Sequence, residues 1–245
     1  MRIILEIGLN HMGNPKLAYK ILRKCLSLQI YGITMQILPA KYYDNSKKFR
    51  RQLKISDYKK FALLTKNKGK KFGLALMDEF TFEKFKILKP NFYKVLSLGF
   101  SNNTLLKKIY KTKKELFVST GFENMHNIKK ICKRYPKINI IHTSLSDKAK
   151  DANLLAISKM KTETSNKVSF GLHSTDHEIV LTAAGYLPDT LFFYVKPDKK
   201  DKYPDDNHAI KLNNLPRLLK MIRNVIIPTG NGNKIKQKVP KWVYE

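Results

Sequence analysis

The chain has 245 residues, 42% of them hydrophobic, and carries a formal net charge of +29 from 48 Lys and Arg against 19 Asp and Glu. It contains no run of about 18 apolar residues, and its first residues lack the features of a signal peptide, so we expect neither a membrane span nor a secretory leader. Two isolated cysteines, Cys25 and Cys132, make neither a disulfide framework nor a zinc site, so we expect a cytoplasmic protein.

The strong positive charge raises the question of a polyanionic partner. Most of the basic residues are lysines, spread along the chain, whereas arginine is the preferred residue for bidentate contacts with phosphates and bases. No segment interleaves the lysines with aromatic residues as a stacking surface for bases would. We therefore expect no specific nucleic-acid partner, and electrostatic nucleic-acid binding remains a weaker alternative to solvated surface charge.

Short β-rich runs alternate with runs of helical periodicity along the whole chain. The predicted strands are residues 2–10, 31–38, 71–77, 92–98, 115–120, 138–144, 168–174 and 190–196. The predicted helices that follow them are residues 15–28, 56–67, 81–88, 101–112, 124–134, 149–160, 176–186 and 215–225.

Eight such units in about 250 residues are typical of a closed (β/α)8 barrel, in which right-handed crossovers join parallel strands. Several strands are apolar on both faces, as buried parallel strands are. A doubly wound open sheet is the alternative, but no glycine-rich phosphate-binding motif follows any strand. We expect one barrel domain over residues 1–228 and a linker-like tail over residues 229–245.

Polar residues stand at the ends of the predicted strands, where barrel enzymes place their chemistry. The first strand ends in Glu6, the fourth carries Lys94, the fifth ends in Ser119, and the seventh leads to His177. Small hydroxyls with one lysine are able to hold a phosphate, and a histidine with carboxylates is able to hold a divalent metal.

Several motifs in this order resemble the sialic acid synthase family, which condenses phosphoenolpyruvate with an N-acylated aminosugar. They are EIGLNHMG at 6–13, KVLSLGFSNN at 94–103, STGF at 119–122, DANLL at 151–155, GLHSTDH at 171–177 and PDDNH at 204–208. The resemblance covers the chain from residue 1 to about 225 and implies a (β/α)8 barrel acting in carbohydrate biosynthesis. We expect no counterpart of the family's C-terminal antifreeze-like domain within these 245 residues.

The resemblance also implies roles for individual residues. Lys94, Ser97 and Ser119 would hold phosphoenolpyruvate, and Ser174 or Thr175 would take the place of a further family serine. Glu6 would act near the reacting carbons, and Asp205 would contact the sugar. His177 would be a catalytic histidine and one of two ligands of a divalent metal, Mn or Mg. The family also allows for a homodimer.

Two departures leave a second interpretation open. Thr34 stands where the family carries a lysine on its second strand, and Tyr194 stands where it carries the second metal histidine. Loss of a cation beside an anionic ligand weakens binding, and one histidine rarely holds a metal without good oxygen partners. The alternative is a catalytically impaired barrel that binds an anion or a partner protein as a scaffold.

Overall fold

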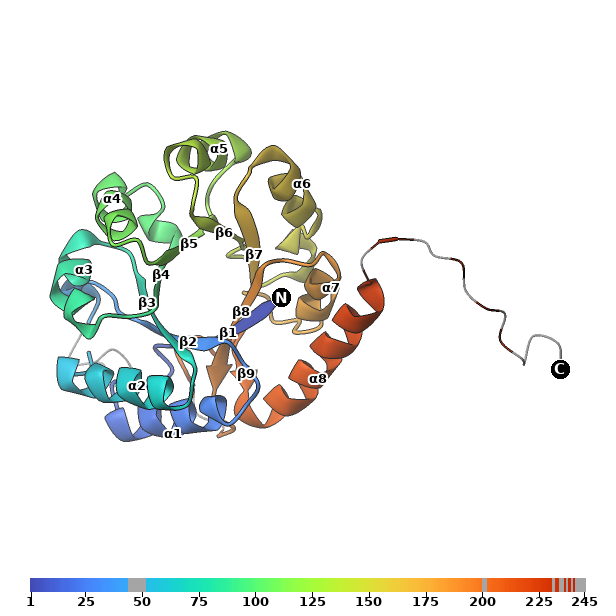
Figure 1. Cartoon of the computed structure of the whole chain (residues 1–245). Helices are drawn as coiled ribbons and strands as arrows, with labels where there is room; N and C mark the ends of the chain where they lie inside the picture. The colour runs from blue at the N-terminus through green and yellow to red at the C-terminus, as the bar shows by residue number, and fades with distance from the viewer. Residues whose placement is uncertain are drawn as a thin grey trace.

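Eight parallel strands form a closed ring inside a ring of helices (Figure 1). The computed structural model describes residues 1–43, 52–199 and 202–230, with residues 232, 233, 236, 238 and 240. The strands are β1 Arg2–Gly8, β2 Gly32–Gln36, β3 Lys71–Leu76, β4 Phe92–Val95, β5 Glu115–Ser119, β6 Asn139–His142, β7 Lys167–Gly171 and β8 Thr190–Lys196. Each strand pairs in parallel with the next, and β8 pairs with β1, which closes the sheet.

The helices that cover this ring are α1 Pro15–Leu26, α2 Ile55–Asn67, α3 Glu79–Phe85, α4 Asn103–Lys111, α5 Met125–Arg134, α6 Leu155–Glu163, α7 Ile179–Gly185 and α8 Leu215–Ile226. The predicted (β/α)8 barrel is confirmed, and the doubly wound sheet is excluded by the β1–β8 pairing. No helix within the described ranges is long and apolar enough to cross a membrane. The boundary expected at residue 228 stays a prediction, because much of 229–245 lies outside the described residues.

Three helix predictions differ from the structure by three residues or more at one end. The Asp78 side chain caps α3 by accepting the Thr81 N–H at 2.8 Å, so that helix begins at Glu79 and ends before a 3-10 turn. Asn153 has a left-handed backbone with φ of 42°, which separates a 3-10 turn at Ala149–Ala152 from α6. Helix α7 is shorter at both ends than the predicted helix over 176–186.

Inside the barrel, side chains from alternate strand positions form a small apolar core. Its buried members are Ile4, Phe92, Phe117, Ile141 and Phe192. Phe117 packs edge-on against Phe92 and Phe192, with ring centroids 5.5 and 5.0 Å apart. This layer fills the middle of the barrel, as in other barrels of eight strands, so the interior is no channel. A much larger apolar cluster lies between the sheet and the helices.

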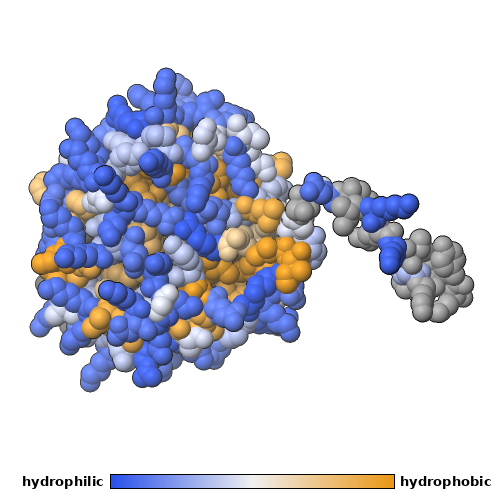
Figure 2. Space-filling model, in the orientation of Figure 1, coloured by the Kyte–Doolittle hydropathy of each residue, from blue (hydrophilic) through white to orange (hydrophobic). Residues whose placement is uncertain are grey.

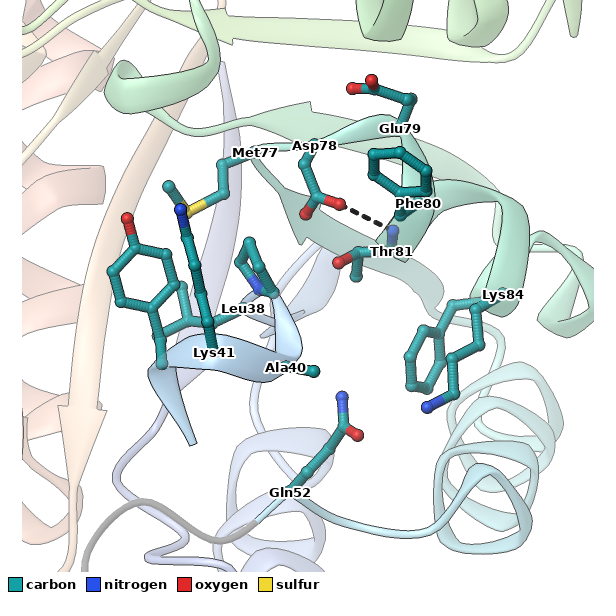
Figure 3. A pocket seen from close by; sticks show the side chains of 13 residues that line it. Leu38, Ala40, Lys41, Gln52, Met77, Asp78, Glu79, Phe80, Thr81 and Lys84 are labelled. Carbon is teal, nitrogen blue, oxygen red and sulfur yellow. Dashed lines mark hydrogen bonds between the residues drawn. The ribbon is translucent and has the colours of Figure 1, made fainter. Parts of the chain in front are cut away.

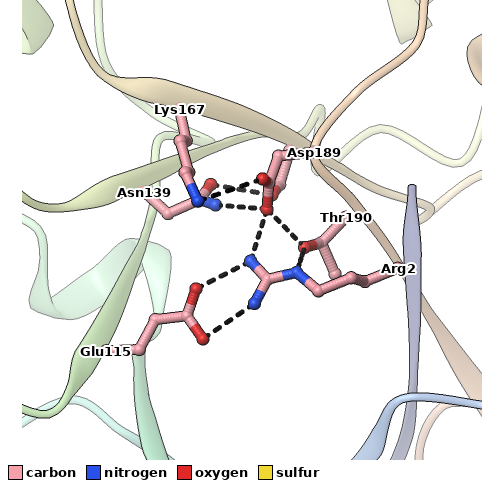
Figure 4. A network of polar contacts seen from close by, with 7 residues as sticks. Arg2, Glu115, Asn139, Lys167, Asp189 and Thr190 are labelled. Carbon is pink, nitrogen blue, oxygen red and sulfur yellow. Dashed lines mark hydrogen bonds and ion pairs between the residues drawn. The ribbon is translucent and has the colours of Figure 1, made fainter.

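Arg2 closes the end of the barrel at which the strands begin (Figure 4). Its guanidinium binds both carboxylate oxygens of Glu115, at 2.9 and 2.7 Å, and also pairs with Asp189. Asn139 and Thr190 donate further hydrogen bonds to Asp189, each at 2.8 Å. Paired charges are stable away from bulk water only when their hydrogen bonds are satisfied. This network meets that condition, and it closes the barrel below the apolar layer.

Candidate active site at the carboxyl ends of the strands

A buried ion pair lies on the barrel axis just above the apolar layer. Glu6 and Lys94 point inward from β1 and β4, and Lys94 Nζ lies 2.6 Å from both carboxylate oxygens of Glu6. Both side chains are 3% exposed or less. Thr34 of β2 is the cross-strand neighbour of Glu6 and donates its hydroxyl to the same carboxylate at 3.3 Å. Lys94 is therefore buried against an anion that the protein itself supplies, the carboxylate of Glu6.

Asp205, from the loop after β8, lies against the turn that follows β1, close to Glu6 and Lys94. Gly8 has φ of +56°, and a Cβ there would lie 2.4 Å from the Asp205 carboxylate and 2.7 Å from the Tyr194 ring. Asp205 accepts the Leu9 N–H at 3.4 Å, and its own N–H donates to the Asn10 side chain at 3.0 Å. Glycine is needed at this position both for the backbone conformation and for the close approach.

Burial raises the pKa of Asp205 to about 7. The negative charge of Glu6 pushes this pKa in the same direction, whereas the Leu9 N–H and the Lys94 charge lower it. At neutral pH the carboxyl group therefore exists in both forms, and it is able to donate or accept a proton. Such perturbed groups are enriched at active sites.

Three aromatic side chains form a cluster beside Asp205. His173 stacks on His208 with ring centroids 4.7 Å apart, and the Tyr194 ring meets His208 edge-on at 4.9 Å. Burial lowers the pKa of His173 to about 3 and that of His208 to about 4, and the Lys94 charge adds to both effects. Both rings are therefore neutral at physiological pH. The Tyr194 hydroxyl donates to Gln36 at 3.1 Å.

His173 and His208 were not among the predicted site residues, although both lie in motifs that carry the family resemblance, GLHSTDH and PDDNH. The signal was their position after the last two strands, where the chain converges on the barrel mouth. The Nε2 atoms of His11, His177 and His208 are buried without a hydrogen-bond partner among the described residues. A buried nitrogen without a hydrogen bond costs free energy, so each of these atoms marks a position where a polar ligand would be favoured.

The three predicted serines lie at the mouth in different settings. Ser119 is buried at the end of β5, and Ser97 accepts the N–H of Gly121, two residues beyond it, at 3.3 Å. The structure thus brings Ser97 next to the loop that follows Ser119, near the strand that carries Lys94. Ser174 instead donates its hydroxyl to the Asp147 carbonyl at 2.9 Å, which fixes the loop after β7.

The residues described do not fit the metal that the family resemblance implies. Burial lowers the pKa of His177, and the Lys196 charge lowers it further, so this histidine is neutral and able to act as a ligand. The Tyr194 hydroxyl, however, is committed to Gln36. No group of three or more His, Cys, Asp or Glu side chains within the described ranges is placed to hold a metal ion.

A cavity of about 600 Å³ opens between the loops after β2 and β3 (Figure 3). Its walls are mainly apolar, from Leu38, Ala40, Met77 and Phe80 among others, with Lys41, Asp78 and Lys84 as polar groups. It starts two residues beyond Gln36, the partner of Tyr194. A mostly apolar pocket of this size with a few polar groups is typical of sites for small molecules.

Fold and site together define a (β/α)8 barrel with titratable side chains gathered at the carboxyl ends of its strands. The chain belongs to the NeuB family, whose family model matches residues 3–234. It is 25% identical to the N,N'-diacetyllegionaminic acid synthase of Campylobacter jejuni, with 96% of this chain and 79% of that protein covered. It is 24% identical to the N-acetylneuraminate-9-phosphate synthase of Mus musculus, with 97% and 73% covered.

A solved N-acetylneuraminic acid synthetase from Leptospira borgpetersenii has the same fold, with a TM-score of 0.86 at 19% identity, covering 96% of this chain and 87% of that one. The expected resemblance to the sialic acid synthase family is confirmed by the family match. The roles of individual residues stay predictions.

Proposed function

We propose that this barrel is a carbon–carbon bond-forming synthase that condenses phosphoenolpyruvate with an N-acylated aminosugar to give a nonulosonic acid. The observation that carries the proposal is that family membership spans the barrel, while Glu6, Lys94 and Asp205 converge at its mouth. A homodimer and a cytoplasmic location belong to the same proposal.

In this proposal Lys94 binds the carboxylate or phosphate of phosphoenolpyruvate, with Ser97 and Ser119 as hydrogen-bond donors. Both carboxylate oxygens of Glu6 contact Lys94 Nζ. Lys94 therefore has to give up at least one of these contacts in order to bind the ligand. Asp205, with a pKa of about 7, is the group able to hold or give up the proton of a sugar hydroxyl or aldehyde oxygen. The neutral His173 and His208 rings line the same space and exclude water.

In the same proposal, the cavity beside Gln36 binds the acyl substituents of the sugar. Acyl groups combine an apolar methyl group with an amide, and the cavity combines apolar walls with Gln52, Thr81 and Lys84. The binding of a substituent away from the reacting carbons lowers KM and orients the aldehyde toward the mouth.

A second candidate is a barrel that binds an anion without turnover. It is favoured by the full pairing of Lys94 with Glu6 and by the lack, among the described residues, of a set of side chains that fits the metal. The two candidates agree on anion binding and differ only in catalysis.

Calorimetric titration with phosphoenolpyruvate, with and without manganese, tests the proposal, and sulfate serves as the control for general anion attraction. The variant is Lys94→Met with Glu6→Gln, which removes the pair without leaving a buried charge. Lys71→Met, exposed at the far end of β3, is its matched control. We expect saturable binding above that of sulfate, lost in the pair variant and kept in the control.

Turnover is then measured with a panel of N-acylated aminosugars. Product that depends on Lys94 supports the synthase, whereas phosphoenolpyruvate binding without any product supports the anion-binding scaffold. Binding no better than that of sulfate would contradict both.

A further inference from the structure

Exposed lysines surround the end of the barrel that lies opposite the candidate site. Each strand from β3 to β7 has at least one of them in the turn before it or at its first residue: Lys68, Lys89, Lys113, Lys114, Lys137 and Lys167. Figure 1 looks onto this end, because the strands run clockwise from β1 to β8 and right-handed crossovers then place their starts toward the viewer. Figure 2 shows the same face, dominated by hydrophilic side chains.

Carboxylates are distributed the other way. At the strand starts, Glu115 and Asp189 are both held by Arg2 inside the barrel, and Glu163, at the end of α6, pairs with Lys129. The loops that follow the strands instead carry Asp78, Glu79, Glu123, Asp147, Asp151 and Asp176, interspersed with lysines. A compositional excess of lysine alone would charge both ends alike. Among the residues that the structure describes, the lysines at the end away from the mouth therefore have fewer carboxylates beside them than the lysines at the mouth.

Large apolar side chains protrude from the same basic face. Ile87 is 58% exposed in the 3-10 turn before β4, between Lys86 and Lys89, and Leu187 is 43% exposed in the turn before β8. Met1 is 41% exposed, and Ile227, directly after α8, is 77% exposed. Figure 2 shows hydrophobic atoms gathered beside the end of α8 on this face.

We propose that this face docks onto a membrane surface that contains anionic lipids. Lysines on flexible stems are attracted to an anionic leaflet, while protruding isoleucine and leucine side chains enter the boundary between headgroups and acyl chains. The mouth of the barrel then faces the water phase and stays open to its substrates.

A nucleic acid fits this face less well than a bilayer does. The basic residues are lysines, which lack the planar fork that arginine offers to phosphates. The exposed aromatic side chains of the described ranges lie elsewhere: Tyr19 on α1, Phe80 in the first turn of α3, and Tyr42 and Phe122 after strands. Among these residues, none offers this end a stacking surface for bases. Exposed aliphatic side chains favour the bilayer.

The test is flotation of the full chain with phosphatidylcholine vesicles, with and without phosphatidylserine, at roughly 0.15 M salt. The basic-face variant changes Lys68, Lys89, Lys113 and Lys137 to Gln. The matched control changes Lys16, Lys41, Lys148 and Lys150, which are exposed at the mouth end, and removes the same charge. Each lysine near an anionic leaflet contributes roughly fivefold, so we expect the first variant to lose on the order of a hundredfold or more in partitioning.

The control should lose less than about tenfold, since its charges lie farther from the membrane than the Debye length. Equal loss in both variants, or equal binding to vesicles without phosphatidylserine, would overturn the proposal. In a second variant, Ile87→Ser with Leu187→Ser, we expect severalfold weaker binding. Unchanged binding there, or displacement from the vesicles by a DNA duplex that binds the same lysines more tightly, would identify a general polyanion surface and refute membrane docking.

Discussion

Replacement of Asp205 by Asn is expected to stabilise the protein at alkaline pH and to leave its stability unchanged in acid. The side chain packs against Gly8 and the Tyr194 ring, and its desolvation raises its pKa to about 7 in the folded chain. Asparagine has nearly the shape of the protonated acid, and its side-chain oxygen is able to accept the Leu9 N–H that Asp205 accepts now.

The magnitude follows from the difference between the folded and the unfolded pKa. A carboxyl group with an ordinary pKa of 3.8 when unfolded and a pKa of about 7 when folded binds its proton more tightly in the folded chain. Its favourable contribution is complete below the unfolded pKa and is lost as the pH rises through the folded pKa. Three pH units correspond to about 4 kcal/mol, an upper bound, since each unit is worth about 1.4 kcal/mol.

The assay is urea unfolding of the wild type and of Asp205→Asn at about pH 5 and about pH 8.5. The buried His11, His173 and His208, whose pKa values are lowered, make both proteins less stable as the pH falls, and this effect cancels in the difference. We expect the variant to gain up to about 3 kcal/mol over the wild type between these two pH values, since the rest of the change falls below about pH 5. Asp206→Asn, a half-exposed neighbour, is the control. A difference independent of pH would refute the assigned pKa.

Three further changes test the packing and the mouth. Arg2→Met should cost about 2 to 4 kcal/mol in urea unfolding, because Glu115 loses its cation and Asp189 keeps only the more distant Lys167, at 3.6 Å. A loss below about 1 kcal/mol would contradict this. Lys94→Met alone should cost about 3 to 5 kcal/mol, and the addition of Glu6→Gln should recover most of this loss, whereas additive costs would argue against the ion pair. Ala40→Phe narrows the cavity and should raise KM for N-acylated sugars severalfold. The affinity for phosphoenolpyruvate, measured by calorimetry, should not change. Weaker phosphoenolpyruvate binding would show instead that the cavity belongs to the anion site.

The barrel could be predicted from sequence because its determinants are local. Each strand is a short apolar run, and each helix repeats apolar residues at helical spacing, so every unit is visible within about 30 residues. Polar residues such as Glu6 and Lys94 were assigned to the mouth because they end or interrupt apolar strands. The predicted ends of α3 and α6 were wrong, because a side-chain cap at Asp78 and a left-handed Asn153 set the ends of these helices.

The contacts within the site depend on pairings that sequence spacing does not encode. Lys94 reaches Glu6 across 88 positions, and Asp205 approaches Gly8 only because the loop after β8 folds back over β1. The resemblance named Asp205 but gave no reason for a raised pKa, which arises from burial beside Glu6. The stacking of His173 on His208 was missed for the same reason, since the two lie on different loops.

The position of Thr34 links these observations. In the family that the sequence resembles, a lysine at this place would give the mouth a second cation, and Glu6 and an anionic ligand would each have a partner. Here Thr34 offers Glu6 a hydroxyl at 3.3 Å, and Lys94 is the cation that neutralises Glu6 through both carboxylate oxygens. An incoming phosphate or carboxylate therefore meets a paired charge, and it gains Lys94 only to the extent that Glu6 gives it up. Under the proposed function, anion binding at this mouth would thus be coupled to the opening of the Glu6–Lys94 pair, which is a physical reason to measure binding before turnover.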